Sequence, residues 1–389
     1  MKGFQFSGIA AGIKTNGKKD LGIIYSQRPA SAAALFTTNK VVAAPVILGR
    51  ERILPGICQA VVVNSGNANC FTGDQGYKDA LETARVAAEI LNIPEDLVLV
   101  ASTGVIGAPL PMEKMQTGIP LVVADMASDK ADDFAEAILT TDLAKKMVRK
   151  TCTIKGKTFT VCGFAKGSGM IRPNMATMLA FVCTDVDISS TLLKTVLQKA
   201  CAVSFNRISV DGDTSTNDML IAMANGMSGA VLEDSDDALD FQRVMDETLL
   251  ELSKMIVRDG EGATKLARIV VRGAASAQDA FLTAEAIAHS NLVKTALYGE
   301  DPNWGRITAA AGRSGAMVDP DKMDLFFGEV PLVMGGVWQG VDAEKEAAKG
   351  MKADELEIIL DLNLGDHSDF FMFCDFSENY VKINADYRS

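Results

Sequence analysis

The sequence predicts a mixed α/β (α+β) protein with a layered sandwich core and a smaller C-terminal α/β domain. Apolar runs alternate with helical patterns along the 389 residues, which is typical of mixed folds. Hydrophobic residues make up 48% of the chain and charged residues 23%, which is too apolar for disorder. At about 150 residues per domain, the length indicates two or three folding units.

The first part of the chain contains strands and helices in alternation. Residues 59–63 are expected as a buried strand that leads into a turn at 64–67, and residues 97–101 as another apolar strand that ends in Ser102-Thr103-Gly104. Between them, residues 79–91 have a helical pattern that ends before Pro94. A further helix is expected over 131–139.

The middle of the chain contains the clearest patterns. Residues 157–164 alternate as a half-buried strand does, whereas 178–183 are continuously apolar and fit a central strand. Helices are expected over 192–203 and 236–257, and in the second of these the apolar residues recur at steps of three and four.

The C-terminal part has shorter elements. A strand is expected over 267–271, a helix over 277–297, strands over 356–362 and 370–383, and short apolar pieces with glycines over 322–337. We therefore expect a catalytic core of residues 1–272 and a C-terminal domain of residues 273–389, with the boundary near Gly273.

Charge excludes two classes of partner. Lys and Arg number 38 against 50 Asp and Glu, a formal net charge of −12, and such a surface repels nucleic-acid backbones and anionic lipid. No apolar run reaches the ~18 residues of a membrane span. Lys14, Lys18 and Lys19 interrupt the first 20 residues, which therefore do not resemble a secretory signal. We expect a cytoplasmic protein with no nucleic-acid or membrane partner.

Cysteine and histidine usage narrows the chemistry. The seven cysteines are odd in number and form no CxxC pair, which is typical of free thiols in a reducing compartment. The two histidines, His289 and His367, lie in an apolar helical segment and in a polar turn, where structural or surface roles are expected. A histidine-rich metal site cannot be built from them. If the protein is an enzyme, its base is therefore a carboxylate, a lysine or an amine.

One segment has an unusual composition. The residues KGSGMIRPNMATML (166–179) form a glycine-containing polar loop that runs directly into the apolar strand. Ala176 is small, so that the peptide bond before Thr177 can be approached closely, and Thr177 stands at the mouth of the strand. On pattern alone, Thr177 would be read simply as the first residue of a core strand, and composition alone does not identify it as a nucleophile.

This segment resembles the glutamate N-acetyltransferase family of arginine biosynthesis, also called the ornithine acetyltransferases. The resemblance continues along essentially the whole chain, in the same order. It includes residues 64–69, 102–107, 140–142, 204–218, 259–265, 299–306 and 383–385.

The resemblance implies a self-cleaving enzyme with an N-terminal nucleophile. Cleavage between Ala176 and Thr177 would give an α chain of residues 1–176 and a β chain of residues 177–389. It would also place a free α-amine on the residue that carries the hydroxyl. An α-amine has a pKa of about 7.7–8.0, so it can act as a general base and activate the weakly nucleophilic hydroxyl. We expect the cut to proceed by attack of the Thr177 hydroxyl on the Ala176 carbonyl.

The resemblance also implies roles for other residues. The Thr103 hydroxyl and the Gly104 N–H would stabilise the oxyanion. Lys166 would pair with a substrate carboxylate, and Glu261 with the cationic amine of ornithine. Ser389 stands where the family often has threonine, and it keeps the hydroxyl. Without the resemblance, Ser102-Thr103-Gly104 would be an ordinary turn, Lys166 a surface lysine and Glu261 a polar loop residue. The implied substrate contacts are Thr140, Lys166, Thr177, Glu261, Asn384 and Ser389.

The implied reaction is a ping-pong transfer. An acetyl group moves from N-acetylornithine to Thr177, ornithine leaves, and glutamate takes the acetyl group. Some members of the family also make N-acetylglutamate from acetyl-CoA, and no residue here decides this. The resemblance implies an α2β2 heterotetramer and no cofactor, neither a metal nor a prosthetic group.

Two alternatives remain open at this point. A related N-terminal-nucleophile aminopeptidase or amidase would transfer the acyl group to water. A catalytically silent binding protein would keep the fold but not the reaction.

Overall fold

The structure is a computed structural model that describes residues 1–172, 178–232 and 235–386. The chain divides into two compact units. Unit 1 holds residues 1–206 and 213–256, and unit 2 holds residues 207–212 and the chain from Val257 onward. The chain passes into unit 2 after Ile256, which is earlier than the boundary expected near Gly273. Gly273 itself lies inside unit 2, in strand β10 (Leu266–Ala274).

Unit 1 is built on an eight-stranded sheet, counted over the described residues. Its order is β4-β3-β2-β9-β7-β6-β5, and β1 pairs with β2. The strands are β1 (Phe4–Ile9), β2 (Leu21–Phe36), β3 (Ile57–Asn67), β4 (Val98–Val105), β5 (Lys146–Ile154), β6 (Lys157–Lys166), β7 (Leu179–Thr184) and β9 (Met219–Ala224).

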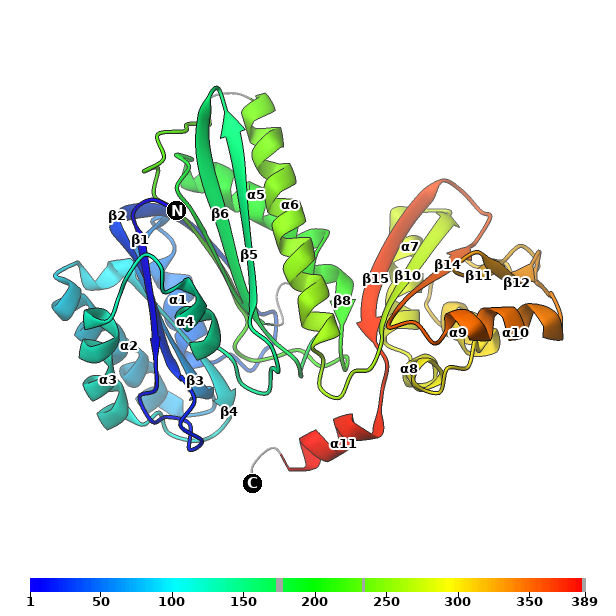
Figure 1. Ribbon diagram of the computed structural model, residues 1–389, viewed down its shortest axis with the longest axis horizontal. Coiled ribbons are helices and arrows are strands. Elements are labelled where there is room, and N and C mark those ends of the chain that lie inside the picture. Colours follow the sequence, from blue (N-terminus) through cyan, green and yellow to red (C-terminus); the bar gives the residue numbers. More distant parts are fainter. Residues whose placement is uncertain (173–177, 233–234, 387–389) are drawn as a thin grey trace. The chain divides into compact units, whose positions relative to one another are not determined.

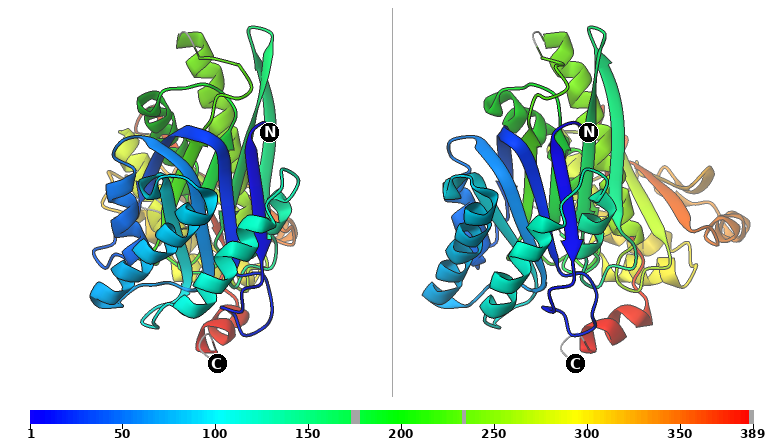
Figure 2. Two further views of the ribbon diagram at one scale, coloured as in Figure 1. Left: turned by 90° about the vertical axis from the view of Figure 1, so that its left-hand side faces the viewer. Right: turned by 60° about the vertical axis from the view of Figure 1, so that its left-hand side comes forward.

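A break in strand β2 divides this sheet into two layers. Before the register shift between Tyr25 and Ala30, β2 pairs with β1 and β3. After it, β2 pairs with β3 only at Ala30 and Ser31 and then continues along β9. The layers face each other, since the ring centroid of Phe6 in β1 lies 5.4 Å from that of Phe164 in β6. Phe134 packs edge-on against Phe164 with 5.2 Å between the centroids. The core of unit 1 is thus a layered sandwich, as expected (Figures 1 and 2).

Helices cover the outer faces of the sandwich. Figure 1 shows α2 and α3 beside β3 and β4, and α6 along β5 and β6. Gly163 allows the close approach of α6, because a Cβ there would lie 2.8 Å from Leu252. Strand β6 is consequently buried from Phe159 onward and is not half-buried as expected. The helices are α1 (Ala44–Arg52), α2 (Gly73–Leu91), α3 (Met112–Ala124), α4 (Ala131–Ala137), α5 (Ser190–Ala202) and α6 (Ser235–Arg258), with 3-10 turns at Glu95–Leu97 and Phe205–Arg207.

Unit 2 has a seven-stranded sheet within the described part of the chain, in the order β13-β12-β11-β14-β10-β15-β8. Helix α7 packs on this sheet, and the rings of Phe281 and Phe371 lie 5.5 Å apart. The strands are β8 (Ile208–Ser209), β10, β11 (Asp324–Phe327), β12 (Val330–Met334), β13 (Val337–Trp338), β14 (Glu355–Asp361) and β15 (His367–Cys374). The helices are α7 (Ala277–Ala288), α8 (Asn291–Tyr298), α9 (Trp304–Gly312), α10 (Val341–Gly350) and α11 (Glu378–Ala385).

Three expected elements differ from the structure. The helix expected over 277–297 is broken, because the Ser290 hydroxyl accepts a hydrogen bond from Val293 N (3.4 Å) and starts α8. The strand expected over 370–383 ends at Cys374. The carboxylate of the next residue, Asp375, binds the backbone N–H of Thr264 (2.8 Å), and α11 follows. Residues 64–67, expected as a turn, belong to β3.

The cysteines are all free thiols. Burial raises the pKa of Cys58 and of Cys162 to about 12, so these two are poor nucleophiles at neutral pH. Of the helices in the described ranges, none is both long and apolar enough to cross a membrane.

Candidate active site

Polar residues from distant parts of the sequence meet at one edge of the unit 1 sandwich. The Asn217 side chain, just before β9, donates hydrogen bonds to the carbonyls of Ala68 (2.6 Å) and Ser102 (2.8 Å). Lys166, the last residue of β6, donates from Nζ to Thr103 Oγ1 (3.2 Å). Four of the segments identified in the sequence, 64–69, 102–107, 166–179 and 204–218, therefore meet at the ends of the strands.

Thr103 and Gly104 are held at the end of β4. Gly104 has a φ of +136° and lies so close to Gly66 that a Cβ would come within 2.3 Å of the Gly66 carbonyl carbon. Only glycine fits this position. The Ser102 hydroxyl donates to Asn64 Oδ1 (2.5 Å), which ties β4 to β3. The segment is thus a rigid strand end and not an ordinary turn.

Lys166 and the buried carboxylate of Asp142 act on each other electrostatically. The side chain of Lys166 is 8% exposed, so it is not a surface lysine. Asp142 Oδ1 accepts hydrogen bonds from Lys146 Nζ (2.7 Å) and from Gly167 N (2.7 Å), and its Oδ2 accepts one from Thr140 N (3.0 Å). This carboxylate therefore fixes both Thr140 and the chain directly after Lys166.

The charge state of Asp142 follows from its neighbours. Burial acts to raise the pKa of Asp142, but the ammonium groups of Lys166 and Lys146 outweigh it and hold the pKa below its ordinary value. Asp142 is consequently ionised at neutral pH, which offsets part of the positive charge of two buried lysines.

Lys14 is a member of this site that the sequence analysis missed. Its Nζ donates to the carbonyls of Leu139 (2.7 Å) and Lys19 (2.8 Å), and Leu139 directly precedes Thr140. Burial lowers the pKa of Lys14 to about 8, although Asp20 and Asp142 act in the opposite direction. No pattern singles out Lys14, because the loop between β1 and β2 brings it to the site.

Unit 2 brings together two further expected residues. Asn384 Nδ2 in α11 donates a hydrogen bond to Glu261 Oε2 (2.8 Å), and Glu261 is buried. The neighbouring Gly262 has a φ of +68°, and a Cβ there would lie 2.6 Å from Tyr380 N. The Ser377 hydroxyl binds the Gly262 carbonyl (2.6 Å), so α11 begins close to Glu261.

The expected site residues thus form one group in each unit. Unit 1 gathers Thr103, Gly104, Thr140 and Lys166, and unit 2 pairs Glu261 with Asn384. The remaining expected residues, Ala176, Thr177 and Ser389, lie outside the described residues.

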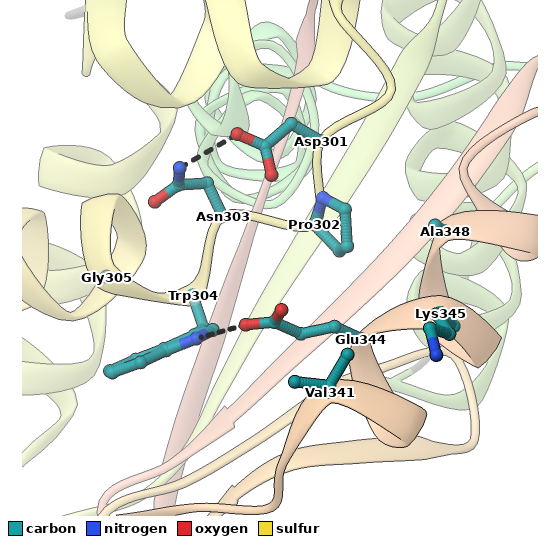
Figure 3. Close-up of a pocket in the computed structure, with 9 residues that line it drawn as sticks. All are labelled: Asp301, Pro302, Asn303, Trp304, Gly305, Val341, Glu344, Lys345 and Ala348. Atoms are coloured by element: carbon teal, nitrogen blue, oxygen red, sulfur yellow. Dashed lines mark hydrogen bonds between the residues drawn. The ribbon is translucent and has the colours of Figure 1, made fainter.

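A hollow of about 450 Å³ in unit 2 contains part of the 299–306 motif but none of the expected site residues (Figure 3). Trp304 Nε1 donates to Glu344 Oε1 (3.0 Å) and so links α9 to α10. The Asn303 side chain accepts from Arg306 N (3.1 Å) and caps α9. This part of the motif therefore shapes the structure of unit 2.

The histidines contribute to neither group. His289 ends α7 with its ring edge-on to Phe371, 6.0 Å between centroids, and His367 is exposed at the start of β15.

Comparison with known proteins decides the family. The model of the ArgJ family matches residues 5–389. The chain belongs to the ArgJ family. It is 52% identical over 391 residues to the arginine biosynthesis bifunctional protein ArgJ of Geobacter sulfurreducens, with 100% of both chains covered. It is 48% identical to the protein of the same name from Syntrophotalea carbinolica, covering 100% of this chain and 99% of that protein.

A solved ArgJ structure agrees with this assignment. The crystal structure of arginine biosynthesis bifunctional protein argJ from Bacillus halodurans is 41% identical with a TM-score of 0.51, and it covers 53% of this chain and 98% of that chain. The resemblance stated from the sequence is therefore confirmed, as is the layered α/β fold class. As a member of the ArgJ family, the chain is an acetyltransferase of arginine biosynthesis.

Proposed function

We propose that this ArgJ-family enzyme moves an acetyl group from N-acetylornithine to glutamate through an acetyl ester on Thr177. The observation that carries the proposal is the hydrogen bond from Lys166 Nζ to Thr103 Oγ1. The group formed by these two residues lies at the edge of the sheet where β7 begins. Met178, the residue that follows Thr177 in the chain, has its carbonyl hydrogen-bonded to Met219 N (3.0 Å) at that edge.

The Thr103 hydroxyl is the proposed side-chain donor to the oxyanion. A lysine ammonium has only donors, so Lys166 donates to the Thr103 oxygen and leaves the hydroxyl hydrogen of Thr103 available to another acceptor. A tetrahedral intermediate supplies that acceptor as its negative oxygen. The backbone N–H of Gly104 is the proposed second donor, in a position where a side chain cannot fit.

The nucleophile is proposed to arise by self-cleavage between Ala176 and Thr177, which gives fragments 1–176 and 177–389. One comparison supports a split near the middle. The solved chain from Bacillus halodurans is matched over 98% of its length and yet covers only 53% of this chain, about the share expected of one fragment. After cleavage, the Thr177 α-amine takes the hydroxyl proton, and the hydroxyl oxygen attacks the acetyl carbonyl.

Substrate recognition is proposed to use both groups of residues. N-acetylornithine and glutamate both carry carboxylates, which Lys166 can bind, with Thr140 held beside it by Asp142. Glu261, oriented by Asn384, would bind the side-chain ammonium of ornithine. Ser389 is proposed as a further substrate contact.

The proposal also covers a second activity, the cellular compartment and the assembly of the fragments. The name of the relatives includes the word bifunctional, which supports a second activity. We propose that in this second activity acetyl-CoA acetylates the enzyme. The protein is proposed to act in the cytoplasm, where its free thiols stay reduced. Its fragments are proposed to assemble as an α2β2 heterotetramer.

The test compares transfer with hydrolysis. Purified enzyme is given N-acetylornithine with and without glutamate, and N-acetylglutamate and free acetate are measured. The proposal expects N-acetylglutamate as the main product and little acetate. Acetate released at the same rate without glutamate would instead support the aminopeptidase or amidase alternative.

A further inference from the structure

The carboxyl group of Asp218 is buried and incompletely paired. Asp218 directly precedes β9 and is 2% exposed. Its Oδ2 belongs to the few buried side-chain oxygen and nitrogen atoms that have no hydrogen-bond partner within the described residues. Because burying such an atom costs stability, an unpaired oxygen at this position requires an explanation.

Asp218 lies among the strand ends that form the unit 1 site. Its carbonyl accepts a hydrogen bond from Thr37 N (3.0 Å) just beyond β2, and the neighbouring Asn217 binds the Ser102 carbonyl (2.8 Å). The hydroxyls of Ser215 and Thr37 bind its carboxyl group, and Lys166 on β6 is the charged side chain that acts on it within the described residues.

The environment of the carboxyl group favours its neutral form. Burial raises the pKa of Asp218 well above its ordinary value and outweighs the opposing effects of Ser215, Lys166 and Thr37. A neutral carboxyl group carries a proton that it can donate at working pH. Asp142, by contrast, is ionised in the same unit, so the two carboxyl groups are suited to different tasks.

We propose that Asp218 is the catalytic acid that gives a proton to the amine leaving the acetyl donor and recovers it from the acceptor amine. This inference rests on the proposed function. The donor is an amide, and its amine is a poor leaving group until its nitrogen is protonated. The unpaired Oδ2 is the atom that can supply this proton, since Lys166 acts on the Asp218 carboxyl group and the neighbouring Asn217 binds the carbonyl of Ser102, which precedes Thr103.

The protons balance over the two halves of the reaction. As the Thr177 oxygen bonds to the acetyl carbon, its proton moves to the Thr177 α-amine. The C–N bond then breaks, and the departing nitrogen keeps the electron pair and takes the Asp218 proton. In the second half, the glutamate amine bonds to the acetyl carbon and gives a proton to the Asp218 carboxylate. The Thr177 oxygen leaves the acetyl carbon and recovers its proton from the ammonium.

The test compares two acetyl donors in Asp218→Asn. N-acetylornithine requires protonation of its leaving group, whereas p-nitrophenyl acetate releases a stable phenolate and does not. We expect Asp218→Asn to lose about 10²–10⁴-fold in transfer from N-acetylornithine but to stay within about threefold of wild type in the acetylation burst with p-nitrophenyl acetate. We also expect kcat/KM of wild type for N-acetylornithine to fall at high pH as Asp218 loses its proton, and this fall to be absent in Asp218→Asn.

Asp185→Asn is the matched control. Asp185 is also a buried aspartate, but it follows the opposite end of β7 and binds Thr160 N (2.7 Å) and Lys2 N (2.7 Å). A substitution that acts only through stability should lower the rates with N-acetylornithine and with p-nitrophenyl acetate by the same factor. We expect this result for Asp185→Asn.

Three results would overturn the inference. They are equal losses with both donors in Asp218→Asn, an unchanged rate with N-acetylornithine, and an Asp218→Asn chain that is not cleaved. Failure of the proposed function looks different, since wild type would then remain uncut or Thr177→Ala would retain transfer.

Discussion

Lys166 Nζ and Thr103 Oγ1 form a hydrogen bond of 3.2 Å, although the two residues are 63 positions apart in the chain. Lys166 ends β6 and Thr103 lies near the end of β4, and these strands are separated by β3, β2, β9 and β7 in the order of the sheet. The bond forms because the shift in β2 folds the sheet over itself. The geometry of the proposed oxyanion site therefore depends on the sandwich as a whole.

The Thr103 hydroxyl is expected to be required for catalysis and not for folding. Thr103→Val keeps the shape of the side chain but removes the proposed donor, and we expect kcat for acetyl transfer to fall about 10²–10³-fold. Thr103→Ser keeps the hydroxyl and is expected to retain most of the activity. Equal rates for Thr103→Val and wild type would show that another group stabilises the oxyanion.

Gly104 is expected to be essential for the strand end itself. In Gly104→Ala the new Cβ would lie 2.3 Å from the carbonyl carbon of Gly66. Alanine would also be strained at a φ of +136°. We expect a loss of more than about 3 kcal/mol in the free energy of unfolding. Gly107→Ala is the control, because Gly107 also has a positive φ but its Cβ would have no neighbour within 4 Å. Its expected loss is only about 1 kcal/mol, and similar losses in both variants, measured by denaturant unfolding, would contradict this explanation.

Lys14 is expected to make stability depend on pH. Its pKa is lowered from 10.5 to about 8 in the folded protein, so between these values the unfolded chain binds more protons. Stability therefore rises with pH across this range through this group. The unfolding temperature of wild type relative to Lys14→Met should increase between pH 8 and pH 10. A difference that stays constant or decreases would show that Lys14 is not held in the way described.

Glu261 is expected to discriminate between the two substrates. N-acetylornithine carries a side-chain ammonium and glutamate does not, so Glu261→Gln should raise KM for N-acetylornithine about tenfold and change KM for glutamate much less. Asn384→Asp replaces the amide that donates to Glu261 with a second carboxyl group. If Asn384 orients Glu261, this variant should also raise KM for N-acetylornithine more than KM for glutamate. Equal increases in both KM values would assign Glu261 a structural role.

Local sequence patterns predicted much of the fold but little of the polar network. Strand β7 and helix α6 follow from apolar periodicity, and both are found close to their predicted bounds. The break at Ser290 was missed, because a single capping hydroxyl interrupts an otherwise continuous helical pattern. The change from strand to helix after Cys374 was missed because the Asp375 carboxylate binds residues 111 and 110 positions away.

The residues of the candidate site were likewise predicted only in part from the sequence. The motif resemblance identified Thr103, Gly104 and Lys166, which the structure places together. Lys14 carries no local signal, and Asp218 lies in the 204–218 segment of the resemblance without being distinguished from its neighbours there. The importance of both comes from burial among residues that are distant in the sequence. Such residues require the folded structure to be recognised.

The central claim is that the enzyme makes its own nucleophile by cutting before Thr177. The most direct measurement is intact-mass spectrometry of wild type and Thr177→Ala after incubation with N-acetylornithine. The account predicts two wild-type fragments, 1–176 and 177–389, with one added acetyl group on the second, and a single unacetylated chain for Thr177→Ala. A wild-type protein that exchanges acetyl groups at full rate while it remains one uncut chain would contradict the account.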